Sequence, residues 1–126
     1  MPNQDSGATK IIEPLAKFHA RLDRDGRVTI PRHVRAVFHI NKDDYIKATI
    51  RRVHVDLDLK TIFILGEDSG VIMRVGRGGM VTIPQKIREE LQLDPGDLVE
   101  IIIENVFKLK TGYEREFKYV RGTKND

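Results

Sequence analysis

The chain of 126 residues contains no cysteine. Disulfide bonds, thiolate catalysis and zinc–thiolate sites are therefore excluded. No apolar run approaches the roughly 20 residues that a membrane-spanning helix needs, and the first residues lack the basic and apolar regions of a signal peptide. We expect a cytoplasmic protein with no membrane partner.

Aromatic residues are scarce, with three tyrosines and five phenylalanines. They are too few and too scattered to form a platform on which nucleic-acid bases stack. The four histidines lack metal-ligand spacing, so we expect no metal site and no cofactor. Asp56 and Asp58 share a strand face, but an isolated Asp-x-Asp indicates a solvated strand edge. We therefore expect no catalytic residues and no enzyme.

One segment of the chain occurs twice. Arg24–Pro31, with the sequence RDGRVTIP, returns 53 residues later as Arg77–Pro84, with the sequence RGGMVTIP. The match continues without gaps from residues 20–53 to residues 73–106. A unit of about 50 residues seldom buries enough apolar surface to fold alone. The two copies are therefore expected to share one core, within one chain or between two chains.

Each copy predicts the same series of short elements. Asp-Gly at residues 25–26 favours a hairpin turn, and the β-branched residues that follow favour a strand. Pro31 suits the first turn of a short helix over residues 33–38. A polar turn and a long strand follow, at residues 45–58 and 98–110, and a last strand completes each ββαββ unit, at residues 61–65 and 116–120. The fold class is mainly β.

Composition divides the chain into five segments. Residues 1–10 are polar and unpatterned, which indicates a disordered arm, and the Gly-Glu-Asp-Ser-Gly stretch indicates a linker. The predicted division is a disordered arm at 1–10, a first repeat at 11–65, a linker at 66–71, a second repeat at 72–121 and a short tail at 122–126.

The two copies differ in charge. The whole chain carries a net charge of +3. Residues 20–53 hold nine Lys and Arg against four Asp, a net charge of +5, whereas residues 73–106 hold four against six acidic residues, a net charge of −2. Such asymmetry favours the first copy as the half that faces a polyanion.

The repeated motif resembles a known family. Gly-Arg-Val-Thr-Ile-Pro at residues 26–31, with a short helix, a polar turn and an amphipathic strand after it, is similar to the AbrB/SpoVT/MazE (SpoVT-AbrB) DNA-binding domains. Residues 80–101 match more closely, and the Pro-Gly-Asp turn at 95–97 looks like the GD box of cradle-loop barrels. The two copies are similar to the tandem arrangement of MraZ proteins. The resemblance implies a cradle-loop barrel of the AbrB swapped-hairpin type, built from two ββαββ repeats with one short helix each.

The same resemblance implies a nucleoid-associated, DNA-binding transcriptional regulator or architectural protein. Its partners would be double-stranded DNA and further copies of itself, as a homodimer or a higher homo-oligomer. Arg27 matches the family's arginine after the turn glycine, and Arg35 and Arg88 match its helix arginine. Guanidinium groups bind phosphates and guanine edges in two-pronged contacts. The full set of candidate DNA-binding residues is Arg21, Arg24, Arg27, Arg32, Arg35, Arg74, Arg77, Lys86 and Arg88.

The chain also departs from the family pattern. The second copy has Met80 in place of the turn arginine. Arg21 and Arg74 lie one residue beyond a position that is often basic in the family. A shift of one residue along a strand moves a side chain to the opposite face of the sheet.

Two alternative functions remain open. One is an antitoxin, which binds a toxin partner and usually needs a long disordered tail to do so. The predicted tail of this chain is short, at residues 122–126. The other is an enzyme similar to the CTP-dependent riboflavin kinases, which share a related barrel. Gly76–Gly79 is not followed by the helix or the Gly-Lys-Ser/Thr of a phosphate-binding loop, which favours the regulator.

Overall fold

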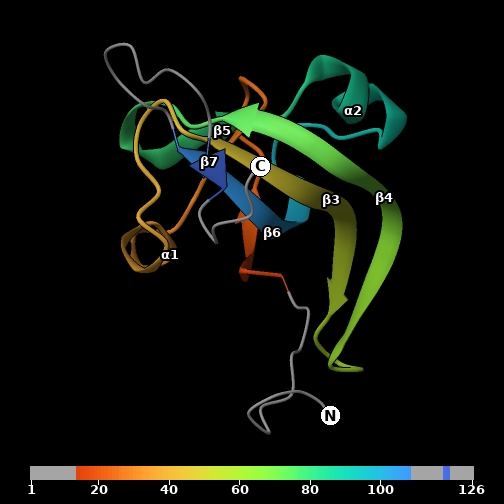
Figure 1. Ribbon diagram of the computed structural model, residues 1–126. Coiled ribbons are helices and arrows are strands. Elements are labelled where there is room, and N and C mark those ends of the chain that lie inside the picture. Colours follow the sequence, from red (N-terminus) through yellow and green to blue (C-terminus); the bar gives the residue numbers. More distant parts are fainter. Residues whose placement is uncertain (1–13, 109–117, 120–126) are drawn as a thin grey trace, which may run out of the picture.

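The computed structural model describes residues 14–108 and 118–119 (Figure 1). The predicted arm at 1–10 and tail at 122–126 lie outside the described residues, as do most of the last predicted strand at 116–120 and residues 109–110 of the long one.

Strands form most of the described chain, and two helices of six residues interrupt them. The prediction of a mainly β fold with two short helices is confirmed. The elements in order are β1 (Ala16–Arg21), β2 (Arg27–Thr29), α1 (Arg32–Val37), β3 (Tyr45–Asp56), β4 (Thr61–Arg74), the 3₁₀ turn η1 (Arg77–Gly79), β5 (Met80–Thr82), α2 (Gln85–Glu90), β6 (Leu98–Lys108) and β7 (Lys118–Tyr119).

The described strands form two antiparallel sheets rather than a single closed barrel. One sheet has the order β1-β6-β3-β4, with β7 also paired to β6, and the other pairs β2 with β5. The pairing crosses between the two halves of the chain: β1 lies on β6, with Ala20 opposite Val99, and β2 lies on β5, with Val28 opposite Val81. Each half therefore completes a sheet of the other, which explains how units too small to fold alone share one core.

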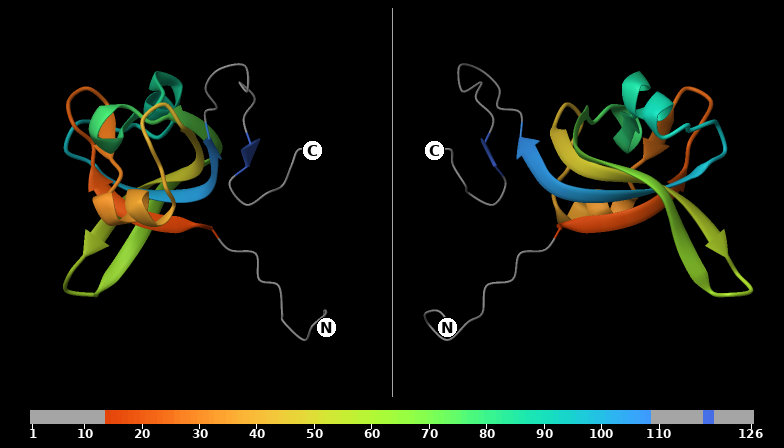
Figure 2. Two further views of the ribbon diagram at one scale, coloured as in Figure 1. Left: turned by 60° about the vertical axis from the view of Figure 1, so that its left-hand side comes forward. Right: turned by 90° about the vertical axis from the view of Figure 1, so that its right-hand side faces the viewer.

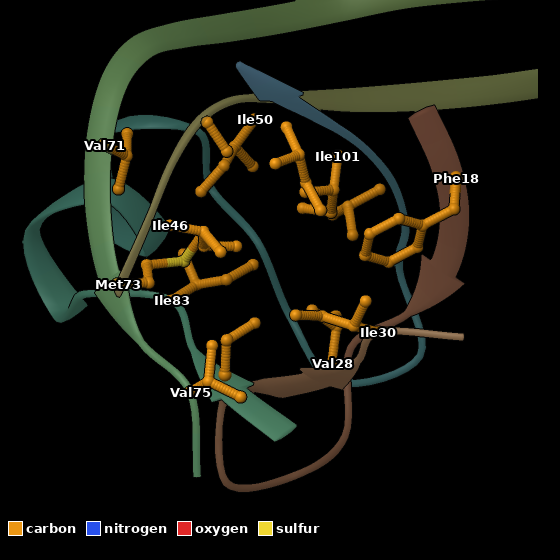
Figure 3. Packing of buried hydrophobic residues seen from close by; sticks show 14 of the residues in the cluster. Phe18, Val28, Ile30, Ile46, Ile50, Val71, Met73, Val75, Ile83 and Ile101 are labelled. Atoms are coloured by element: carbon orange, nitrogen blue, oxygen red, sulfur yellow. The ribbon is translucent and has the colours of Figure 1, made fainter. Parts of the chain in front are cut away.

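The core lies between the two sheets (Figure 3). Val28 and Ile30 enter it from the first copy of the motif, and Ile83 enters it from the second. They meet side chains of the larger sheet such as Ile46 and Ile101. Ile30, Ile46, Ile83 and Ile101 have no exposed surface. The Val-Thr-Ile-Pro motif therefore supplies two core residues in each copy, while its threonine points away from the core.

The prediction that residues 66–71 form a linker loop is wrong. These residues continue β4, which runs without interruption from the first half of the chain into the second. Arg51 lies opposite Glu67, and their side chains form an ion pair with 2.6 Å between Nε and Oε1. Register shifts in the β3–β4 ladder and a left-handed φ of 68° at Gly70 accommodate the polar stretch. Pairing with β3 overrides the turn-like local composition, as tertiary context commonly does in strands.

The distal part of the β3–β4 hairpin projects from the body of the molecule (Figures 1 and 2). A register shift follows Arg52, and the ladder then continues from Val53 opposite Ile64 to Asp56 opposite Thr61. We call residues 53–65 the arm. The first strand of the arm ends at Asp56, two residues before the predicted end.

Candidate nucleic-acid interface

The β2–β5 ladder presents one face to the core and one face outward. Val28 and Val81 are buried at its centre. Because neighbouring side chains in a strand point to opposite faces, the residues on either side of these valines face outward, and each is at least partly exposed: Arg27, Thr29, Met80 and Thr82. This outer face is the only place in the ladder where the two copies of the motif can contact a large ligand together.

The turn before β2 holds two arginines and two aspartates. Gly26 has a left-handed φ of 77°, which glycine adopts without a steric penalty. The Arg27 guanidinium pairs with both carboxylates, at 3.2 Å to Asp23 Oδ2 and 2.8 Å to Asp25 Oδ2. The backbone N–H of Arg27 also donates to Asp23, and this hydrogen bond is the main reason that the pKa of Asp23 lies below its usual value. Arg24 is exposed and forms no ion pair with a described residue.

The equivalent turn before β5 holds a cation and no carboxylate. It consists of Gly76, Arg77, Gly78 and Gly79, and the last two glycines have left-handed φ values of 72° and 81°. Arg77 is exposed. Within residues 14–108 and 118–119, no side chain forms an ion pair with it. Its positive charge is therefore less compensated than that of Arg27.

Two helix arginines fasten these turns, each from the opposite half of the chain. Arg35 of α1 donates its Nε to the carbonyl of Ile30 at 2.9 Å, and its guanidinium lies against Gly79, where a Cβ atom would come within 2.7 Å of Cζ. Arg88 of α2 does the same with Ile83, also at 2.9 Å, and lies against Gly26. The terminal nitrogens of both arginines form no hydrogen bond to the part of the chain that the structure describes, and both side chains remain partly exposed.

Cations from both halves line one concave surface beside the outer face of the ladder. Its volume is about 660 Å³, and its lining includes Arg27, Lys42, Arg74 and Arg77 together with Asp43, Gly76, Met80 and Thr82. Arg74 Nη2 lies 2.6 Å from Asp43 Oδ1. This hydrogen bond lowers the pKa of Asp43 and raises that of Arg74. Four cations and one carboxylate line the surface, and Asp23 and Asp25 pair with one of the cations, Arg27. The surface therefore carries a net positive charge, which favours an anion.

Comparison with known proteins identifies the second half. Residues 72–111 match the family described as antidote-toxin recognition MazE, bacterial antitoxin. The match spans the end of β4, the second copy of the motif, α2 and β6. Residues 72–111 are therefore similar to the AbrB/MazE-like family.

A solved structure resembles a larger part of the chain. The solution structure of PHS018 from Pyrococcus horikoshii is 28% identical in sequence and superposes with a TM-score of 0.62, over 79% of this chain and 99% of that chain. The similarity therefore extends beyond the MazE-like segment into the first half. No curated protein matches the chain significantly.

Three further candidate residues, Arg21, Arg32 and Lys86, do not line the concave surface. Arg21 donates from Nη1 to the carbonyl of Gly96 at 2.9 Å and lines a different hollow, with Arg52 and His54 at the base of the arm. Arg32 and Lys86 are exposed on the first turns of α1 and α2, and neither pairs with an acidic residue among those described.

The sequence did not single out Lys42 as a site residue, although it lines the concave surface. Its counterpart in the MazE-like half is Pro95, so the two copies share no basic residue at this position that would indicate a site. The charge count favoured the first copy as the half that faces a polyanion, whereas both halves line this surface. The MazE-like half contributes Arg74 and Arg77 to the surface, and the more basic first half contributes Arg27 and Lys42.

The described residues give no indication of two other kinds of site. The residues that the structure covers contain no group of three or more His, Asp or Glu side chains placed to hold a metal ion. None of the described helices combines the length and apolarity of a membrane-spanning helix.

Proposed function

We propose that this protein binds double-stranded DNA as a cytoplasmic, nucleoid-associated transcriptional regulator, and that it has a binding role rather than a catalytic one. The observation that carries the proposal is the concave surface where Arg27, Lys42, Arg74 and Arg77 converge beside the exposed β2–β5 ladder. Lys and Arg side chains that neutralise phosphates provide most of the affinity of a protein for DNA. The AbrB/MazE-like family supports the same conclusion.

The cations of this surface would contribute unequally. Arg77 has no carboxylate partner among the described residues, so a phosphate meets no competing ion pair there. Arg27 and Arg74 are held by Asp23, Asp25 and Asp43, and a phosphate must displace or share those carboxylates. We therefore infer that Arg77 contributes more to binding than Arg27, although the first half is the more basic.

The ladder itself is of a size that suits a groove. A two-stranded β-ribbon fits the DNA major groove, where base edges are distinguishable. The outward residues of β2 and β5 are an arginine, a methionine and two threonines. An arginine can bind a guanine edge, and a threonine can contact the methyl group of thymine. In this proposal the ladder reads bases, while the turn and helix arginines hold the backbone on either side.

Binding to short duplexes over a range of salt concentrations tests the proposal. If about four to six phosphates are neutralised, the logarithm of the association constant falls against the logarithm of salt concentration with a slope of roughly −3.6 to −5.4. A slope near zero, or no binding at low salt, would refute DNA binding. Selection of bound fragments from genomic DNA then identifies the preferred sequence.

An antitoxin is the second candidate, because the matching family is described as an antitoxin that recognises a toxin. The two candidates are separable by experiment. A regulator enriches specific DNA from a random pool by itself. An antitoxin also forms a stable complex with a co-expressed toxin and lifts the growth arrest that the toxin causes.

A further inference from the structure

The arm exposes an unusually apolar surface. Six of its residues are large, hydrophobic and exposed, with exposed fractions from 43% at Phe63 to 81% at Leu57: Leu57, Leu59, Ile62, Phe63, Ile64 and Leu65. Four of them are consecutive in β4. Because the arm projects from the body (Figure 2), side chains on both faces of this strand are exposed.

The arm also presents an unprotected strand edge. β4 is the outermost strand of the larger sheet on this side. Residues 61–65 contain no charged residue and no proline. Native proteins usually protect such edges with charges, prolines or a covering element, because unpaired N–H and C=O groups bind another strand. The sequence Thr-Ile-Phe-Ile-Leu has instead the β-branched and aromatic residues that favour strand pairing.

The area of this surface is close to what a protein interface needs. With about 180 Å² for a fully exposed side chain of this size, the six residues expose roughly 600 Å² in each copy, divided between the two faces of the arm. A standard interface buries about 800 Å² in each partner.

Charge argues against DNA as the partner of the arm. Residues 53–65 contain Asp56 and Asp58 against the single cation Lys60. A negative net charge and a lack of arginine are unfavourable beside phosphates. A hydrophobic strand edge with little charge is instead complementary to itself.

We propose that the arm joins two copies of this chain by antiparallel pairing of their β4 edges, around a two-fold axis near Phe63. Antiparallel self-pairing needs no second kind of surface, because the same patch meets its own copy. Phe63 already stacks on His54 across the hairpin, with ring centroids 6.4 Å apart, so its ring is held on one face of the arm. Pairing would join the larger sheets of both copies into one continuous sheet.

Light scattering on the purified chain without DNA tests this interface. We expect a mass twice the 14.5 kDa of one chain at micromolar concentration. The double substitution Ile62→Lys with Ile64→Lys puts charge on the edge, and we expect it to raise the dissociation constant by about 100-fold or more. Val37→Lys is the matched control, since Val37 is an exposed apolar residue on α1, and this substitution should leave the dimer unchanged.

Disulfide cross-linking locates the axis independently of the lysine variants. The chain has no cysteine of its own, so Ile62→Cys, Phe63→Cys and Ile64→Cys can be oxidised one at a time. Antiparallel pairing places only one of these positions opposite itself, so one variant should cross-link much faster than the other two. Val37→Cys should not cross-link.

Several results would overturn the proposal. A wild-type chain that is monomeric at 50 to 100 µM, or a dimer that persists in the double lysine variant, excludes the arm as the interface. Equal or absent cross-linking at all three positions excludes edge pairing around an axis near Phe63, even if the lysine variant fails to fold. A toxin or DNA that binds the arm of a monomeric chain would identify a different partner. Because the mass is measured without DNA, failure here leaves the proposed DNA binding intact.

Discussion

Gly79 lies under the guanidinium of Arg35, so an added methyl group there should displace the arginine. In Gly79→Ala the new Cβ would come within 2.7 Å of Arg35 Cζ. The end of an arginine side chain can move away, but it then loses the hydrogen bond from Nε to the Ile30 carbonyl. The neighbouring substitution Gly78→Ala is a matched control, because Gly78 has a similar φ of 72° and no atom within 4 Å of the added methyl group.

Both substitutions place alanine in the left-handed region, which costs about 1 to 2 kcal/mol. Only Gly79→Ala also removes the charged hydrogen bond and leaves the carbonyl of the buried Ile30 without that donor. A lost bond of this kind costs about 1 to 3 kcal/mol. We therefore expect Gly79→Ala to lower the free energy of unfolding by about 2 to 5 kcal/mol, and Gly78→Ala by about 1 to 2 kcal/mol.

Urea denaturation followed by circular dichroism measures both values on one scale. A double-mutant cycle with Arg35→Ala isolates the contact: in that background Gly79→Ala should cost no more than Gly78→Ala, a coupling of about 1 to 3 kcal/mol. Equal destabilisation by the two alanines in the wild-type background would show that Arg35 does not fasten the turn. A coupling near zero would lead to the same conclusion.

Three further predictions concern the concave surface and the DNA binding proposed for it. Arg77→Ala should weaken DNA binding about tenfold and make the salt slope shallower by about 0.9, as expected for one lost phosphate contact. Fluorescence anisotropy titration measures both quantities, and Lys60→Ala on the arm should change neither. Asp43→Asn should strengthen DNA binding by roughly tenfold, because it removes a negative charge and releases Arg74 for one more phosphate. Asp58→Asn makes the same charge change on the arm and is the control. An equal gain in affinity from Asp58→Asn would refute a local effect. The Asp43–Arg74 pair should not respond to pH between 8 and 5. The pKa of Asp43 is lowered from 3.8 in the folded state, so any stability that the pair adds is present above that value and is lost only as the pH falls through the lowered pKa; loss of the effect of Asp43→Asn already at pH 5 would contradict this sign.

Local sequence rules predicted many of the turns and helix starts. Asp-Gly predicted the turn with a left-handed Gly26, and proline after Val-Thr-Ile predicted the start of each short helix, within one or two residues of its observed position. These features depend on the φ angles that glycine and proline allow. They could therefore be predicted without knowledge of the rest of the chain.

The linker and the candidate site show the limits of such rules. Gly-Glu-Asp-Ser-Gly has the composition of a loop, yet it continues β4 because β3 pairs with it and Arg51 pairs with Glu67. Nothing in the sequence indicated that two aspartates would hold Arg27, or that Arg77 would have no carboxylate partner among the described residues. Ion pairing depends on side-chain positions, which the linear charge count does not contain.

The sequence by itself determined that the protein is built from two equivalent β-rich units around one core, since each Val-Thr-Ile-Pro copy carries its own turn, strand and helix start. Only the tertiary structure decided how the copies combine. Crossed pairing of β1 with β6 and of β2 with β5 brings Arg27 and Lys42 of one half beside Arg74 and Arg77 of the other. It also leaves the β4 edge of the arm uncovered. Both outcomes depend on contacts between residues far apart in the chain, which local propensity and composition do not specify.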